Sequence, residues 1–312
     1  MRVGVIGAGV MGTNHARVLG GLPNTTLVGI VDPLTEHRAR AVELAGCRAF
    51  ATLDELIAEG VDAHHEVALA CIARGIHILV EKPIASTVEE GREIVTAASR
   101  AGVTLMVGHV ERFNPAVAAI KQALAGEDIL SIAITRVGPF PPRMSNVGVV
   151  IDLAVHDIDL IRWFTESDIV EVQPQLSSAV AEREDIALLQ FRTASGVLAH
   201  INTNWLTPFK ARNVTVATRG KYVMGDLLTR QVTECFGFKP DGSYSMRHLP
   251  VGHDEPLRAE LISFLAAVHS GGVPAVTGDE GVASLEVAIR CLETPARPAA
   301  FSARKGPHRV VA

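Results

Sequence analysis

The chain has 312 residues, enough for about two domains, and its 48% hydrophobic and 20% charged residues are typical of a globular protein with a large core. A net charge of −5 without a long basic run argues against a nucleic-acid partner, and no apolar run is long enough to cross a bilayer. The cysteines are scattered without metal-ligand spacing, so we predict no metal site. Because the chain begins on a predicted core strand, leaving no room for a signal peptide, we expect a cytoplasmic location.

The first predicted unit is a strand, a glycine-rich turn and a helix. Residues 3–6 are an apolar run typical of a buried strand, Gly7, Gly9 and Gly12 follow in G-x-G-x-x-G spacing, and a helix is predicted over residues 11–19. In such a turn the first glycine permits the bend, the second lets the backbone approach a pyrophosphate, and the third lets the helix pack on the strand. Since the helix N-terminus would face the phosphates, we assign to cofactor binding Gly7, Gly9, Val10, Met11 and Gly12.

A second strand, over residues 26–31, ends at Asp32, where the dinucleotide fingerprint expects a partner for the adenosine ribose hydroxyls. The alternative is that Asp32 only starts a turn before Pro33, but strand, turn, helix and acidic residue all stand in register. Because a carboxylate would repel a 2′-phosphate, we predict NAD as the cofactor and regard NADP as less favoured. Basic residues that could soften this preference follow at His37, Arg38 and Arg40.

The alternation of strands and helices is interrupted further along the chain. A helix over 35–45, a short strand over 48–50 and a helix from Thr52 to about residue 59 are followed within five residues by a helix over 65–73. That interval is too short for a strand and a crossover loop. Either the chain has lost a central strand, or residues are absent from the sequence between Asp62 and His65. We favour the second explanation, which predicts one Cα–Cα separation there well beyond about 3.8 Å.

The remaining elements indicate two domains of different architecture. Strands and helices alternate again with strand 76–80, a helix that Ser86 or Thr87 caps and that ends at residue 101, strand 103–107 and helix 116–124. This alternation predicts a doubly wound parallel sheet, that is, a Rossmann domain over residues 1–115. Residues 116–312 are predicted to form an α+β domain with a large, mostly antiparallel open sheet, whose C-terminal helices are free to pack back on the first domain. Its predicted strands cover 129–137, 169–172, 186–191, 197–205, 214–218 and 222–225, and its helices 152–164, 256–269 and 281–293.

The tripeptide Glu81-Lys82-Pro83 lies at the carboxyl end of a predicted strand, where ligands of open α/β sheets bind. A lysine there can hydrogen-bond a substrate oxygen and stabilise developing alkoxide charge. Taken alone, a solvated surface lysine is the commoner explanation. We assign all three residues to cofactor binding and Lys82 also to catalysis.

A polar stripe interrupts the apolar helix predicted over 152–164. Asp152 and His156 are four residues apart and hence neighbours on one helix face, and Asp159 follows three residues later. A carboxylate beside a histidine orients the imidazole and raises its basicity for proton abstraction, so Asp152 and His156 are candidate catalytic residues. A buried structural triad is about equally consistent with the spacing, whereas a metal site is disfavoured because there is only one histidine.

Basic and amide side chains recur in the predicted loops, where each alone would be ordinary surface. Together they could hold an anionic substrate, because arginine suits the geometry of phosphate groups. The candidates for substrate binding are Arg112, Asn114, Arg136, Arg143, Asp159, Asn204 and Lys210, and Arg212 belongs to the same basic set.

These motifs together resemble the Gfo/Idh/MocA oxidoreductases, the group of glucose–fructose oxidoreductase and inositol dehydrogenase, over essentially the whole chain. The resemblance depends on the glycine fingerprint, E-K-P at 81–83, R-F-N-P at 112–115 and the spacing of Asp152, His156 and Asp159. It implies a Rossmann domain followed by an open-sheet domain that often forms the subunit interface, and hence a homo-oligomer. It also implies that Lys82 and the pair Asp152 and His156 match the family's active-site residues.

Three further runs, 136–143, 147–159 and 204–210, are similar to the UDP-N-acetylglucosamine 3-dehydrogenase branch of that family. This similarity implies a small-molecule sugar-nucleotide substrate and an NAD-dependent oxidation of a hydroxyl, expected at C3, of a UDP-N-acetylhexosamine. The alternatives are a dehydrogenase of a free sugar or cyclitol and a non-catalytic NAD-binding sensor. The sequence departs from the family in lacking the strand and loop expected after Asp62. In the family that loop lines the cofactor site.

Overall fold

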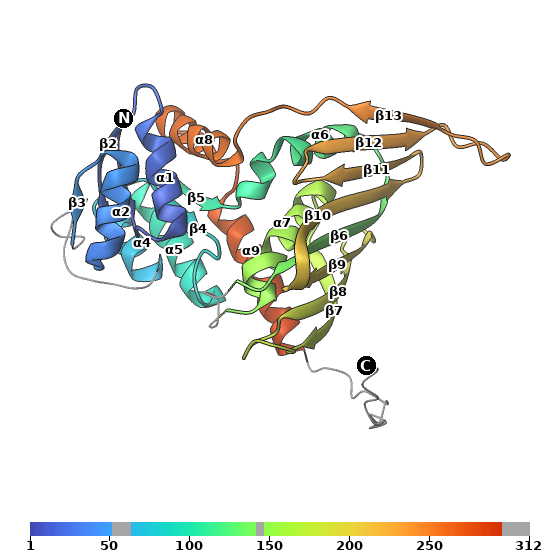
Figure 1. The fold of residues 1–312 in the computed structure, drawn as a ribbon, viewed down its shortest axis with the longest axis horizontal. Coiled ribbons are helices and arrows are strands. Elements are labelled where there is room, and N and C mark those ends of the chain that lie inside the picture. Colours follow the sequence, from blue (N-terminus) through green and yellow to red (C-terminus); the bar gives the residue numbers. More distant parts are fainter. Residues whose placement is uncertain (52–63, 142–146, 295–312) are drawn as a thin grey trace, which may run out of the picture.

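The computed structural model describes residues 1–51, 64–141 and 147–294. Figure 1 shows helices and short strands gathered around the N-terminal half, and beside them one broad sheet formed by the C-terminal half. Among the described helices, none combines the length and the apolar character that crossing a membrane requires.

The N-terminal half is built from parallel strands that alternate with helices, as predicted. Strand β1 pairs with β2 and β2 with β3, while β4 pairs with β5 in a separate ladder, and all of these pairs are parallel. This confirms a Rossmann-like parallel sheet. Its elements are β1 (Arg2–Ile6), α1 (Val10–Gly20), β2 (Thr26–Val31), α2 (Thr35–Ala45), β3 (Ala49–Phe50), α4 (His64–Ile72), β4 (Ile78–Glu81), α5 (Val88–Ala101) and β5 (Leu105–Gly108).

The parallel sheet is divided into two pieces at the place where the sequence is short. Within the described residues, β1 has β2 as its only ladder partner and β4 has only β5. The helix predicted from Thr52, the lost strand and the Cα separation expected between Asp62 and His65 depend on residues outside the described ranges. The division of the sheet agrees with the predicted interruption, and its cause stays a hypothesis.

Local capping signals explain why several helices begin where they do. Thr87, one of the two predicted caps of α5, accepts a hydrogen bond from the Glu90 backbone, and the Glu90 side chain accepts one from the Thr87 N–H. This reciprocal capping box satisfies two backbone donors that a helix N-terminus otherwise leaves free. Helix α5 ends at Gly102, whose φ of +64° is a left-handed conformation that glycine adopts readily.

The C-terminal half contains an eight-stranded sheet in the order β13-β12-β11-β10-β6-β9-β8-β7. Every neighbouring pair is antiparallel except β6 with β9, which confirms the predicted, mostly antiparallel sheet. Helices α6, α7 and α9 cover one face, and the other face is open (Figure 1). The strands are β6 (Ile129–Pro139), β7 (Ile169–Ser177), β8 (Ile186–Thr193), β9 (Leu198–Asn204), β10 (Leu206–Thr218), β11 (Lys221–Asp226), β12 (Gln231–Phe236) and β13 (Ser245–Leu249).

The helical elements of this half are η1 (Val110–Phe113), α6 (Pro115–Ala123), the π-turn η2 (Val150–Ala154), α7 (Val155–Thr165), α8 (Pro256–Ser270) and α9 (Gly278–Glu293). The last two helices pack back on the N-terminal half. Leu257 and Leu261 of α8 share a core with Val5 and Ile30, and Val282 of α9 belongs to the core around β4 and β5. The boundary between residues 115 and 116 stays a prediction.

Candidate active site

The glycine turn after β1 has the geometry that a bound pyrophosphate needs. Gly7 has a φ of +88°, which favours glycine, and its N–H donates to the Val31 carbonyl at 2.7 Å. A Cβ at Gly12 would lie 1.7 Å from the Gly7 carbonyl oxygen, so only glycine permits this packing of α1 on the turn. Gly9 caps α1, and no described atom lies within 4 Å of where its Cβ would be. The space beside Gly9, at the N-terminus of α1, is therefore open, and the first N–H groups of a helix can bind an anion there.

Asp32 lies directly after β2 and contacts the same turn. Its Oδ2 accepts a hydrogen bond from the Ala8 N–H at 2.7 Å, and its Oδ1 accepts one from the Leu34 N–H at 2.8 Å. Burial raises the pKa of Asp32, but these hydrogen bonds and the nearby His37 outweigh burial and hold the pKa below its usual value. A charged carboxylate has further lone pairs, so Asp32 retains capacity for a ribose hydroxyl.

The geometry of the turn and of Asp32 fits a bound NAD molecule. The turn leaves room where Gly9 meets the pyrophosphate, and the carboxylate of Asp32 stands at the end of the neighbouring strand. The apolar side chains of Val10 and Met11 are 60% and 40% exposed at the mouth of the turn, where a cofactor would cover them.

Lys82 connects the two halves of the molecule. It follows β4 directly, and its Nζ donates to the Asp152 carbonyl oxygen at 2.6 Å and lies 3.3 Å from Asp152 Oδ1. The side chains of Lys82 and Asp152 are 15% and 23% exposed, so this ion pair is only partly screened by solvent. The Lys82–Pro83 peptide bond is cis. Glu81, which we predicted to contact the cofactor, instead places Oε1 2.6 Å from Nε2 of the buried His15.

His156 stands near this lysine as a neutral imidazole. Its Nδ1 is buried and has no hydrogen-bond partner among the described residues, and its ring meets His109 edge to face, with centroids 6.1 Å apart. Burial lowers the pKa of His156 well below its ordinary value, and the charges of Lys82 and Arg136 lower it further. An imidazole that is uncharged at neutral pH can accept a proton from a substrate hydroxyl.

No hydrogen bond joins Asp152 to His156 among the described residues, although Asp152 was predicted to orient that imidazole. Asp152 belongs to the π-turn η2 and His156 to the α-helix that follows, and the described Asp152 oxygens bond Lys82 instead. The expectation that residues four apart share one face assumes an α-helix, whereas a π-turn is wider and displaces the side chains. In the described structure Asp152 therefore contacts the lysine and makes no hydrogen bond to the histidine.

Two predicted substrate-binding residues, Arg112 and Asp159, are buried and paired with each other. Arg112 Nε and Nη2 donate to the two carboxylate oxygens of Asp159, both at 2.7 Å, and Nη1 donates to Glu280 on α9. The side chains of Arg112 and Asp159 are 4% and 1% exposed. This contradicts the prediction that they face a substrate, because a ligand would have to break a desolvated bidentate pair.

Arg136 and Asn114 are likewise committed to internal contacts. Arg136 makes a bidentate contact with the fully buried Asp157 and donates to Glu111 at 2.8 Å. Asn114 caps α6, where its Oδ1 accepts from a backbone N–H, and its amide donates to the Leu227 carbonyl. Both were predicted to hold substrate, and the structure instead uses them to join helices to the sheet.

The remaining candidates divide into described and undescribed residues. Arg143 lies outside the described residues. Lys210 is exposed on β10. Its side chain packs beside Gly138 of β6, because a Cβ on that glycine would lie 3.5 Å from the Lys210 Cγ. Asn204 ends β9 and caps the following bend by accepting from the Leu206 N–H. Of the predicted basic residues in the described ranges, Lys210 forms no ion pair with a described carboxylate, and the uncharged Asn204 accepts one backbone hydrogen bond.

Two residues near the site were missed by sequence reasoning. His109 is 1% exposed, and burial lowers its pKa despite the charge of Asp159 nearby. Glu111 is 6% exposed and accepts from both Arg136 and Arg212. His109 follows directly after β5, and its position at the carboxyl end of a parallel strand was an available signal.

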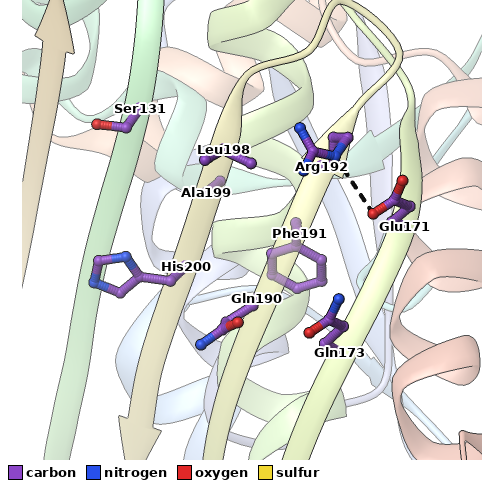
Figure 2. Close-up of a pocket in the computed structure, with 9 residues that line it drawn as sticks. All are labelled: Ser131, Glu171, Gln173, Gln190, Phe191, Arg192, Leu198, Ala199 and His200. Carbon is purple, nitrogen blue, oxygen red and sulfur yellow. Dashed lines mark hydrogen bonds and ion pairs between the residues drawn. The ribbon is translucent and has the colours of Figure 1, made fainter.

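A surface pocket lies away from this constellation, on the open face of the large sheet. Figure 2 shows side chains of β6, β7, β8 and β9 around it, with the Arg192–Glu171 contact at one end. Its exposed members alternate along β8 and β9 with the core residues Leu189 and Ile201 that face the helices. The pocket is therefore on the opposite side of the sheet from His156.

Known proteins share both halves of the chain. Residues 1–109 match the NAD-binding Rossmann-fold domain of the Gfo/Idh/MocA oxidoreductases, and residues 129–223 match the C-terminal domain of that family. The UDP-N-acetylglucosamine 3-dehydrogenase of Acidithiobacillus ferrooxidans is 31% identical over 73% of this chain and 74% of its own. Its crystal structure superposes with a TM-score of 0.86, at 27% identity, over 93% of this chain and 96% of that one.

Inositol 2-dehydrogenase 2 of Saccharopolyspora erythraea is 30% identical over 95% of this chain and 93% of its own. The Rossmann-like fold, the glycine turn and the match to the family models together define an NAD-binding oxidoreductase of the dehydrogenase class. The chain belongs to the Gfo/Idh/MocA oxidoreductase family.

Proposed function

We propose that the protein oxidises a hydroxyl group, expected at C3, of a UDP-N-acetylhexosamine to the keto sugar. The observation that carries this proposal is the position of Lys82 at the carboxyl end of β4, where its Nζ contacts Asp152 and its charge acts on the nearby His156. Bound NAD supplies the hydride acceptor. His156 would take the hydroxyl proton, Lys82 would stabilise the alkoxide charge, and Asp152 would keep Lys82 in place.

Support for a nucleotide substrate comes from the segments 136–143 and 204–210, whose described residues lie next to each other where β6 pairs with β10. Pro139 pairs with Leu206 and Val137 with Ala211, so the exposed Lys210 lies beside the end of β6. A lysine there is available to a diphosphate. The similarity to a UDP-N-acetylglucosamine 3-dehydrogenase agrees with this choice.

A free sugar or cyclitol is the second candidate substrate, and two observations favour it. The inositol 2-dehydrogenase covers more of the chain than the sugar-nucleotide enzyme does. In addition, Arg112 and Arg136 are occupied by buried carboxylates, which leaves fewer cations for a diphosphate. This candidate predicts that added UDP does not inhibit turnover.

The test is a panel of UDP-sugars and free sugars with NAD or NADP, followed by NADH formation. Lys82→Met and His156→Gln should each lower kcat by ~10²-fold or more, whereas Lys210→Ala should mainly raise KM for nucleotide sugars. Near-normal kcat in both site variants would refute the assignment. Cofactor binding without turnover on any sugar would favour the sensor alternative instead.

We infer that the open face of the large sheet joins two or more copies of the chain. Leu188 and Leu198 are 49% and 50% exposed. Leu198 lines the pocket of Figure 2, and Leu188 is an exposed residue of β8, two positions before the pocket residue Gln190. Light scattering should give an oligomer for the wild type and a smaller species for Leu188→Lys, since a buried lysine would need a partner charge. A monomeric wild type would refute this inference. A cytoplasmic location stays a prediction from the sequence.

A further inference from the structure

A buried carboxylate on α8 lacks the partners that such a group normally has. Glu260 is 0% exposed, and neither of its carboxylate oxygens has a hydrogen-bond partner among the described residues. Buried polar groups are almost always satisfied, and leaving a buried charge unpaired is strongly unfavourable. The carboxyl group must therefore either hold a proton or face a bound cation.

Two further ligand-type side chains face Glu260 from other elements. His15 comes from α1 and Glu81 from the end of β4, and the nearest ligand atoms of all three residues lie within 4.8 Å of one another. His15 is 7% exposed, and its Nε2 is 2.6 Å from Glu81 Oε1. The three groups converge on one point from three separate elements.

The two carboxyl groups of this cluster lack a cationic side chain of lysine or arginine beside them. In residues 1–51, 64–141 and 147–294, no lysine or arginine forms an ion pair with Glu81 or Glu260. Burial, together with the charge of Glu81, raises the pKa of Glu260 to about 9. A cation between the carboxylates would remove both the repulsion and the desolvation cost.

We propose that His15, Glu81 and Glu260 bind one divalent transition-metal ion, with zinc as the preferred ion. Imidazole nitrogen and carboxylate oxygen are both ligand types that zinc accepts, and the charges of two ionised carboxylates would balance that of the ion. The fourth position of a tetrahedral site would be taken by water. The 2.6 Å separation of His15 Nε2 and Glu81 Oε1 would have to widen to about 3.3 Å for both atoms to be ligands of one tetrahedral ion.

The position of the cluster gives the ion a structural role. Helix α1 and strand β4 belong to the two pieces of the parallel sheet, and no described ladder joins β1 to β4. A metal held by α1, β4 and α8 would cross-link these pieces beside the glycine turn. This role is independent of the proposed sugar substrate and does not involve Lys82 or His156.

The test measures zinc on the purified full-length chain. Metal analysis before and after dialysis against EDTA, followed by titration with Zn²⁺, should give one equivalent per chain. Glu260→Gln and His15→Gln should each lose stoichiometric binding, whereas the surface controls His65→Gln and Glu286→Gln should retain it. With Zn²⁺ at about 100 times its Kd, the ratio of folded to unfolded wild-type protein should rise about 100-fold, and Tm should rise with it.

Titration with Co²⁺ provides a second readout, because its visible absorption reports ligand type and coordination. It should appear for the wild type and vanish for His15→Gln. If Glu260→Gln does not fold, the zinc stoichiometry of the wild type and the titration of His15→Gln still test whether the site binds metal. Wild-type protein without stoichiometric zinc, or equal binding by the wild type and His15→Gln, would overturn the proposal and leave a proton on Glu260 as the compensating charge.

Discussion

Replacing Gly12 by alanine should damage the apo fold and the cofactor site together. The added Cβ would lie 1.7 Å from the Gly7 carbonyl oxygen and 2.8 Å from its carbon, while real Cβ atoms essentially never come within 3.0 Å. The turn must therefore open by about 1.3 Å, which strains the hydrogen bond from Gly7 N–H to the Val31 carbonyl.

The energetic terms can be estimated separately. Overpacking a well-packed site costs about 1–3 kcal/mol, and a lost backbone hydrogen bond about 1 kcal/mol. Alanine regains about 1 kcal/mol of helix propensity inside α1, so Gly12→Ala should destabilise the protein by about 1–3 kcal/mol. Because misplacement of about 1 Å can cost 10²-fold in a positioned site, NAD affinity should fall by up to that factor.

Gly9→Ala separates binding from folding. Gly9 has a φ of −64° and open space around its Cβ position, so alanine fits the apo backbone. Its apo stability should change by less than about 1 kcal/mol, yet NAD affinity should fall because a methyl group enters the space the pyrophosphate needs. Urea unfolding of the apo protein measures the first effect, and calorimetric titration with NAD measures the second.

Gly20→Ala is the matched control for helix propensity. Gly20 is the last residue of α1, and its Cβ would make an ordinary 3.5 Å contact with the Ala45 carbonyl oxygen. This variant should be as stable as the wild type or slightly more so. An unchanged urea midpoint for Gly12→Ala would refute the steric argument, and unchanged NAD affinity for Gly9→Ala would refute the placement of the pyrophosphate.

Three further predictions concern buried charges. Arg136→Met leaves the fully buried Asp157 without its bidentate partner and should cost about 3–5 kcal/mol in urea unfolding, whereas Met at the exposed Arg219 should cost less than about 1 kcal/mol. The lowered pKa of His156 means that the unfolded chain binds its proton first. The free energy of unfolding should therefore fall as pH drops below about 6.5, and less steeply in His156→Gln; equal slopes would contradict this. Asp185, which accepts three backbone N–H groups, should lose about 1.5–3 kcal/mol as asparagine, measured by thermal unfolding.

Predicting the fold from sequence succeeded where the signal is local and failed where it is not. The helix at 88–101 begins at the Thr87 cap, and the helices at 35–45 and 88–101 both end at a glycine that follows directly in the chain. Strands β12 and β13 were missed. β13 is a short, exposed edge strand, and β12 next to it breaks the alternation by placing the buried Glu234 beside the buried Cys235. Edge strands carry little of the apolar alternation on which strand prediction depends.

The candidate site follows the same division. Lys82 and the glycine turn were located from their place at strand ends, a rule that needs only the order of elements. The contacts of Asp152 and Arg112 in the structure differ from the predicted ones. Each residue pairs with a partner more than 45 residues away along the chain. Spacing along one helix cannot reveal such a partner.

The sequence by itself determined the family, the NAD-binding turn and the carboxylate at Asp32, since these depend on glycine stereochemistry and on neighbours within one strand–turn–helix unit. Only the tertiary structure decided which charges are free. Arginines that look alike in sequence become either buried structural pairs or exposed cations, because desolvation and partner distance set the energy of a charge. The cluster of His15, Glu81 and Glu260 likewise exists only once three distant segments fold together.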